Sequence, residues 1–158
     1  MGVTNFDEYR DVFVVADTID DVVHPVTYEL IGQARRIAKE LGQLVQVMLL
    51  GENVQSEAEE LVAHGADIVH VFESPLLKYY TTDGYTKVLT DFFEDHKPNI
   101  LLIGATNNGR DLAPRMSGRM KNGVVADCTI LTVDTEEGLV EWTRPALGAN
   151  ILAEIISP

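Results

Sequence analysis

The residues with the clearest chemical potential lie at positions 104–115, which read GATNNGRDLAPR and directly follow the apolar run at 100–103. A buried strand, a glycine-bounded loop and a helix start, in this order, present backbone N–H groups to an anion or to a partner. The candidate binding residues of this stretch are Gly104, Thr106, Asn107, Asn108, Gly109 and Arg110.

The glycine spacing permits a mononucleotide site, but the flanking residues argue against one. Gly104 and Gly109 are spaced as in the phosphate-binding motif G-x-x-x-x-G-K-[ST], yet Arg110 and Asp111 replace its last two residues. Gly104 allows close approach of a backbone or a ligand, and Gly109 permits a positive φ. We expect Asp111 to cap the following helix and Pro114 to fall in its first turn. A nucleotide-binding loop stays open beside a structural or interface loop, which is favoured.

A second unusual segment, TRPALGAN, occupies positions 143–150. Arg144 precedes the rigid Pro145, and Gly148 follows three residues later. The simpler interpretation is an irregular crossover between two strands. Alternatively, Arg144 is held in place to bind a carboxylate or phosphate through two hydrogen bonds.

No catalytic group accompanies these segments. His24, His64, His70 and His96 lack metal-ligand spacing, and the single cysteine, Cys128, has no CxxC partner. Because no Ser/His/Asp or Cys/His set presents itself either, we do not expect an enzyme that acts alone. The neighbouring tyrosines allow both core packing, the default, and a partner-facing aromatic patch: Tyr79, Tyr80 and Tyr85.

Charge excludes some partners and marks one region. A net charge of −13 argues against nucleic acid and anionic membranes as main partners. Yet four of the twelve basic residues lie at 110–121 beside one acid: Arg110, Arg115, Arg119 and Lys121. This cluster is either a solvated helix face or an anion- or partner-binding patch, and its position beside the glycine loop favours the patch.

The chain has neither an apolar run of the roughly 18 residues that a membrane span needs nor a secretory signal at its start. Together with the single cysteine, this predicts a cytoplasmic protein without membrane insertion.

Apolar runs alternate with helical patterns over the first 121 residues. We expect strands at 12–16, 44–50, 68–72 and 100–103, and helices at 27–41, 56–65, 83–96 and 112–121. Thr27 is the expected cap of the first helix and Gly42 its stop. This alternation predicts a mostly parallel sheet with helices on both faces, where ligands bind at the carboxyl ends of the strands.

The alternation of strand and helix patterns ends after residue 121. Residues 124–126 could pair in the sheet, 129–133 and 139–143 flank a short loop as in a hairpin, and 151–156 form a last strand. The prediction is one α/β domain over residues 1–158, Rossmann-like, with an antiparallel C-terminal hairpin extension.

Three strings together resemble the alpha subunit of electron transfer flavoprotein: 104–115, ADCT at 126–129, and 143–150. They match in order and spacing, and the resemblance covers essentially the whole chain. One departure is Ala149, where a second glycine is expected, which leaves any close-approach role of that residue in doubt.

The resemblance implies a heterodimer of alpha and beta subunits that carries FAD. It passes electrons between acyl-CoA-type dehydrogenases and a quinone oxidoreductase or a bifurcating partner. It also implies an N-terminal domain that packs on the beta subunit and a C-terminal domain that holds most of the FAD. This chain stops at Pro158, where the junction is expected. It is therefore expected to be the first domain only, either as a piece of a longer chain or as a stand-alone relative.

The expected role of such a domain is a scaffold and beta-subunit interface that binds no FAD firmly by itself. The alternative is a free-standing adenine-nucleotide-binding module, in which the loop at 104–111 would read the nucleotide.

Overall fold

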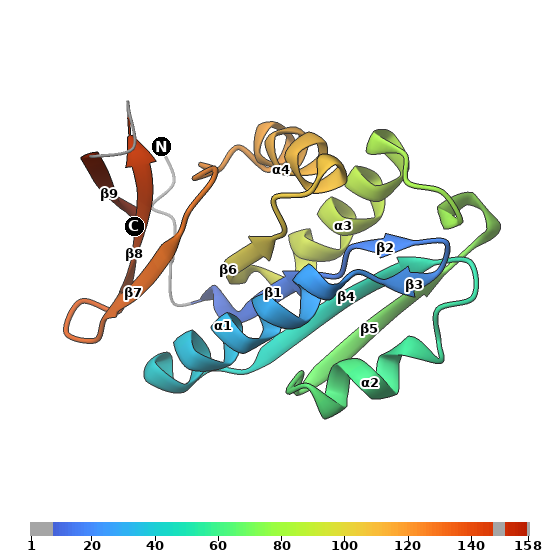
Figure 1. The fold of residues 1–158 in the computed structure, drawn as a ribbon, viewed down its shortest axis with the longest axis horizontal. Helices are drawn as coiled ribbons and strands as arrows, with labels where there is room; N and C mark the ends of the chain where they lie inside the picture. Colours follow the sequence, from blue (N-terminus) through green and yellow to red (C-terminus); the bar gives the residue numbers. More distant parts are fainter. Residues whose placement is uncertain (1–7, 147–150, 158) are drawn as a thin grey trace.

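A parallel sheet forms the centre of the molecule (Figure 1). The computed structural model describes residues 8–146 and 151–157. The parallel strands are β1 (Arg10–Val15), β4 (Val45–Gly51), β5 (Ile68–Glu73) and β6 (Pro98–Ile103). Apolar residues, chiefly valine in β1 and valine and leucine in β4, supply most of the buried positions, as expected for strands that are covered on both faces.

The strand order β5-β4-β1-β6 places the chain reversal between β1 and β6. From β1 the chain moves outward through β4 to β5, then returns to add β6 on the other side of β1. Val15 pairs with Ile103 at the carboxyl ends of these two strands. This pair marks the topological switch point, where ligands of open α/β sheets bind.

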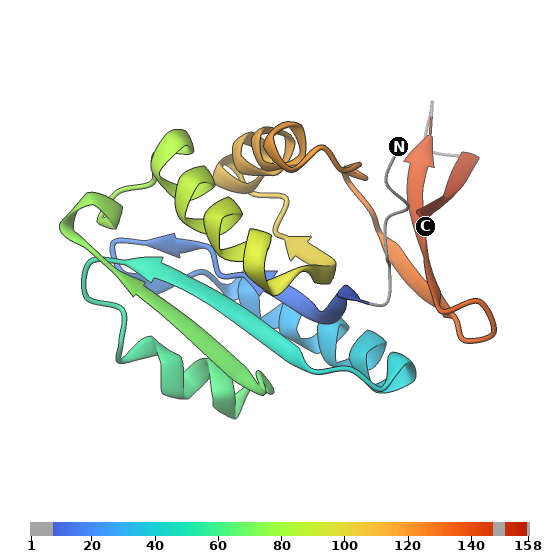
Figure 2. The ribbon, with the colours of Figure 1, turned by 180° about the vertical axis from the view of Figure 1, so that it is seen from behind.

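Two helices cover each face of the sheet, as Figures 1 and 2 show from opposite sides. The helices are α1 (Pro25–Leu41), α2 (Glu57–Ala63), α3 (Thr82–His96) and α4 (Asn107–Met120). Alternate residues of β1 serve the two cores: Val12 and Val14 pack with α1 and α2, whereas Phe13 and Val15 pack with α3 and α4. The predicted parallel α/β fold with helices on both faces is confirmed.

The start of α1 differs from the prediction. His24 is the N-cap, and its Nδ1 accepts a hydrogen bond from the Val26 N–H at 3.1 Å. Thr27 lies one turn inside the helix, fully buried, and its hydroxyl accepts from the Asp17 N–H. Proline favours the first position of a helix, so the helix begins at Pro25 and His24 becomes its N-cap. The predicted stop at Gly42 is confirmed, with a φ of 65°.

Short elements complete the carboxyl edge of the parallel sheet. They are β2 (Thr18–Ile19), β3 (Val22–Val23) and the 3-10 helix η2 (Pro75–Leu77). The first two pair as a small antiparallel hairpin between β1 and α1.

The C-terminal region is a separate antiparallel sheet in the order β7-β8-β9. Its strands are β7 (Ile130–Asp134), β8 (Leu139–Ala146) and β9 (Ile151–Ser157). The hairpin prediction is confirmed, but residues 124–126 form no strand. Val140 and Trp142 pack toward the α1 side of the core, and Arg36 of α1 donates to the Leu131 carbonyl. Figure 1 shows this sheet standing to one side of the α/β body.

Candidate functional site at the strand ends

The candidate loop lies at the switch point, where β6 passes into α4. A small hollow opens there between the ends of β1 and β6, with a free volume of about 20 Å³. Among its lining residues are Asp17, Tyr80, Gly104, Thr106, Asn108 and Gly109. Such a volume holds about one water molecule, whereas ligand pockets typically measure about 300–1,000 Å³.

Helix α4 begins earlier than predicted. Thr106 is its N-cap, and the Thr106 hydroxyl accepts a hydrogen bond from the Gly109 N–H at 3.1 Å. Asn107, Asn108, Gly109 and Arg110 therefore form the first turn of the helix rather than an open loop. The expectation of Asp111 as cap is wrong, since Thr106 offers a hydroxyl three residues before a free N–H.

Pro114 accordingly lies inside α4 and not in its first turn. Proline lacks an N–H, so the Arg110 carbonyl has no helical donor at that point. The remaining turns of α4 are intact on both sides of Pro114.

Both glycines are needed for packing of the chain against itself. A Cβ on Gly109 would lie 1.8 Å from the Gly104 carbonyl oxygen, so only glycine fits there. A Cβ on Gly104 would lie 3.0 Å from Cγ1 of Val26, at the start of α1. Close approach at Gly104 is thus made by a side chain of the same chain. Gly109 does not adopt the positive φ that glycine permits, because this residue is helical.

The charged side chains of the loop already have partners within the chain. The Arg110 guanidinium forms an ion pair with Asp127 at 2.8 Å and also donates to the Ala105 carbonyl. The Asp111 carboxylate accepts from the Tyr80 hydroxyl at 2.6 Å and from the Thr82 hydroxyl at 2.5 Å. These two hydrogen bonds, Thr82 first, lower the pKa of Asp111.

Tyr80 and Tyr85 join the loop before α3 to the site. Burial, followed by the hydrogen bond to Asp111, raises the pKa of Tyr80 to about 12. Tyr85 is buried, its pKa is raised mainly by that burial, and its hydroxyl donates to the Leu77 carbonyl. Tyr79 is exposed, with its ring beside the Lys78 ammonium. Tyr85 is therefore a core residue, as expected by default, whereas Tyr80 hydrogen-bonds Asp111 at the site.

Arg144 does not join the strand-end hollow. It lies in β8, opposite Ala153 of β9, so a regular strand continues through Arg144 and Pro145. Burial raises the pKa of Cys128, and the positive charge of Arg144 offsets part of that rise. The segment 126–129 contacts both candidate segments, because Asp127 pairs with Arg110 and the Thr129 N–H donates to the Thr143 carbonyl. Residues 147–150, including Gly148 and Ala149, lie outside the described residues.

Two residues of the site were missing from the sequence-based candidates. The Asp17 carboxylate accepts from the Asn108 side-chain amide at 3.4 Å, and Asp127 holds Arg110. Asp17 could have been found because it directly follows the apolar run at 12–16, at the expected carboxyl end of a strand. Asp127 carries no such local signal.

No grouping of three or more metal-binding side chains occurs within residues 8–146 and 151–157. Across the same residues, no helix is both long and apolar enough to cross a membrane. The polar groups at the switch point bind one another, so the geometry is that of a closed structural junction.

The fold and the junction define a doubly wound α/β domain with an appended antiparallel sheet. The family model described as "Electron transfer flavoprotein domain" matches residues 12–158. The chain therefore belongs to the electron transfer flavoprotein family.

Relatives specify the subunit that this chain is similar to. The "Electron transfer flavoprotein subunit alpha" of Megasphaera elsdenii is 48% identical over 96% of the chain, which covers 45% of that relative. "Lactate dehydrogenase (NAD(+),ferredoxin) subunit LctC" of Acetobacterium woodii is 46% identical over 94% of the chain and 35% of the relative. "Protein FixB" of Rhizobium meliloti is 40% identical over 95% of the chain and 43% of the relative. The chain thus spans less than half the length of these relatives and matches the N-terminal part of the alpha subunits.

Proposed function

We propose that this chain is the scaffold domain of an electron transfer flavoprotein alpha subunit. It docks the beta subunit and positions a flavin-carrying domain that lies outside residues 1–158. Through the assembled complex, electrons pass between acyl-CoA-type dehydrogenases and a downstream acceptor. The observation that carries the proposal is the closed switch point, where the groups that could hold a ligand contact one another instead.

The residues at the switch point do not fit a flavin. The free volume of about 20 Å³ is far smaller than an isoalloxazine or an adenine ring requires. The Val26 side chain fills the space beside Gly104, and the Gly104 carbonyl fills the space beside Gly109. Both glycines are buried, so neither exposes its backbone to a cofactor. We therefore assign FAD binding in the complex mainly to residues outside 1–158.

The antiparallel sheet supports a docking role. Within the described residues, β9 pairs only with β8, and β7 pairs only with β8, so both outer strands are edges. An edge strand carries unpaired N–H and C=O groups that a partner strand or loop can satisfy. This sheet stands beside the α/β body in Figure 2, where a partner can reach it.

A visible absorption spectrum of the purified chain tests the cofactor assignment. The scaffold role predicts no flavin band near 450 nm after purification, or after incubation with FAD and gel filtration. A stoichiometric flavin band would overturn the assignment. The denatured supernatant provides the control, because released flavin fluoresces strongly even at low occupancy.

The rival function is a free-standing adenine-nucleotide-binding module, favoured by the position of the loop between β1 and β6. Calorimetry with AMP and ATP separates the two functions. A nucleotide module binds either ligand, and Arg110→Ala weakens that binding. The scaffold predicts no heat of binding, and it predicts that Arg110→Ala lowers affinity for the beta subunit instead. Lys78→Ala, which removes a partly exposed cation that pairs with Glu52, is the matched control.

A further inference from the structure

A groove separates α3 from α4 on the outer side of the molecule. It has a volume of about 700 Å³ and is open to solvent. Asp83, Thr86 and Lys87 line it from α3, and Arg115, Gly118 and Arg119 line it from α4. A Cβ on Gly118 would meet no atom within 4 Å, so the α4 side of the groove is open space at this position.

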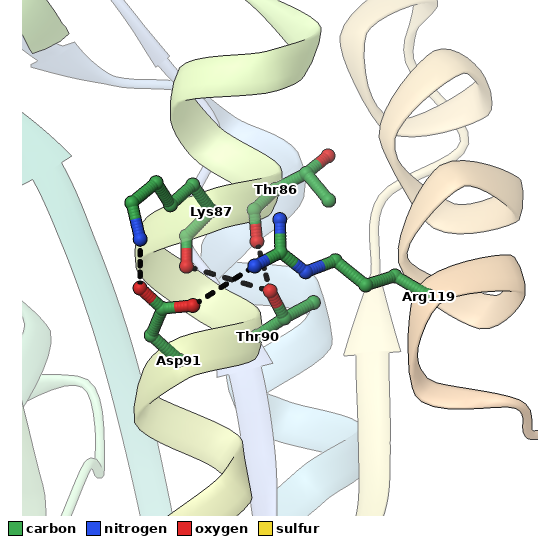
Figure 3. A network of polar contacts seen from close by, with 5 residues as sticks. All are labelled: Thr86, Lys87, Thr90, Asp91 and Arg119. Carbon is green, nitrogen blue, oxygen red and sulfur yellow. Dashed lines mark hydrogen bonds and ion pairs between the residues drawn. The ribbon is translucent and has the colours of Figure 1, made fainter.

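One buried group in the groove lacks a partner. Thr86 is only 2% exposed, and its Oγ1 is the sole buried side-chain polar atom without a hydrogen bond among the described residues. Figure 3 shows this hydroxyl pointing from α3 toward α4, away from the contacts of the Thr86 carbonyl. A buried hydroxyl without a partner is energetically unfavourable, so it is a ready donor for an incoming acceptor.

The groove is positive on an acidic protein. Lys87 and Arg119 both pair with Asp91, and Arg115 pairs with Asp83 at 3.2 Å (Figure 3 for the Asp91 contacts). All of these pairs are at least partly exposed, and exposed pairs contribute little to stability. Three of the side chains that line the groove are cations and one, Asp83, is a carboxylate, so the lining is positive although the whole chain carries −13. Asp91 and Asp111, which also act on these cations, are not among the lining residues.

We propose that the groove between α3 and α4 is a docking site for an acidic segment of a partner protein. A carboxylate of that segment accepts from the Thr86 hydroxyl and from the Arg119 guanidinium. A segment fits better than a small anion, because the cations come from both helices and are already weakly paired, so binding needs several carboxylates at once. The site lies on the face of the sheet that α3 and α4 cover, and it is distinct from the strand-end junction and from the edges of the β7–β9 sheet.

A titration of the ¹⁵N-labelled chain with a hexaglutamate peptide, followed by amide chemical shifts at about 20 mM salt, tests the proposal. We expect shifts centred on Asp83, Thr86, Lys87, Arg115 and Arg119. Thr86→Val should weaken binding about tenfold, since a hydrogen bond to a charged group is lost. The same variant should raise Tm of the free chain by about 2–4 °C, because the unpaired hydroxyl is gone.

Three further variants define the site. Thr86→Ser keeps the hydroxyl and should keep wild-type affinity, whereas Arg119→Gln should weaken binding. Arg36→Gln removes a comparably exposed arginine that pairs with Glu40 on α1, and it should leave peptide affinity unchanged.

Several outcomes would overturn the proposal. These are shifts outside the groove, or affinities that neither Thr86→Val nor Arg119→Gln changes. Equal shifts with the same concentration of free glutamate would indicate a small-anion site instead. Groove shifts that grow with chain concentration alone would identify the occupant as a second copy of this chain.

Discussion

Gly109 lies so close to Gly104 that a Cβ on Gly109 would sit 1.8 Å from the Gly104 carbonyl oxygen. This contact brings the first turn of α4 directly against the end of β6 and fixes the direction in which the helix leaves the sheet. The glycines that first indicate a phosphate-binding loop are therefore explained by packing within the chain.

We predict that Gly109→Ala destabilises the protein by about 2–3 kcal/mol, because the methyl group forces the backbone at Gly104 to move. Urea denaturation followed by circular dichroism measures the effect. Gly118→Ala is the matched control on the same helix. Its Cβ meets open space, so the higher helix propensity of alanine should stabilise by about 0.5–1 kcal/mol. Equal effects of the two variants would contradict the close contact.

Thr106→Ala should cost about 1 kcal/mol of stability, since it removes the N-cap of α4. Thr106→Ser retains the hydroxyl and should stay within about 0.5 kcal/mol of the wild type. The free energy of unfolding from urea titrations distinguishes them. If Thr106→Ser proved as destabilising as Thr106→Ala, the hydroxyl would not be the cap.

Tyr80 makes stability depend on alkaline pH. Its pKa is about 12 in the folded chain and 10.0 in the unfolded reference, so the folded state favours the protonated phenol. This contribution is complete below pH 10.0 and is lost as pH rises toward about 12. Tyr80→Phe should flatten the fall in unfolding free energy over this window. Asp111→Asn should lower the pKa of Tyr80, measured by tyrosinate absorbance, because the charge that opposes its ionisation is gone.

His70 makes stability depend on acidic pH. Burial and the nearby His96 ring lower its pKa below 6.5, and its Nε2 lies 2.7 Å from Oε1 of Gln46. The folded state therefore binds this proton less readily than the unfolded state. The resulting stability is present above pH 6.5 and is lost as pH falls through the folded pKa.

We expect His70→Gln to reduce that loss in urea titrations below pH 6.5. His96→Gln should raise the pKa of His70 part of the way back, because burial still acts on the ring. NMR titration of the imidazole protons measures this, and an unchanged value in His96→Gln would show that the two rings do not interact electrostatically.

The parallel sheet was predictable because its strands are mainly apolar runs, such as residues 12–15 of β1. The hairpin was predictable for a similar reason: Asp134 and Leu139, which pair across its turn, flank a short loop that ends in Gly138. Both signals are local in the sequence.

The start of α4 was not predictable from local signals. Thr106 and Asp111 are both good caps, and the choice between them depends on Tyr80 and Thr82, which bind the Asp111 carboxylate from a distant segment. The pairing of Arg110 with Asp127 is equally non-local. Nucleotide binding at this loop stays a prediction of the rival function.

Sedimentation of this chain with its cognate beta subunit tests the central claim most directly. A scaffold that docks the beta subunit predicts a 1:1 complex at micromolar concentration, formed whether or not FAD is added to the mixture. Absence of association at micromolar concentration would contradict the account.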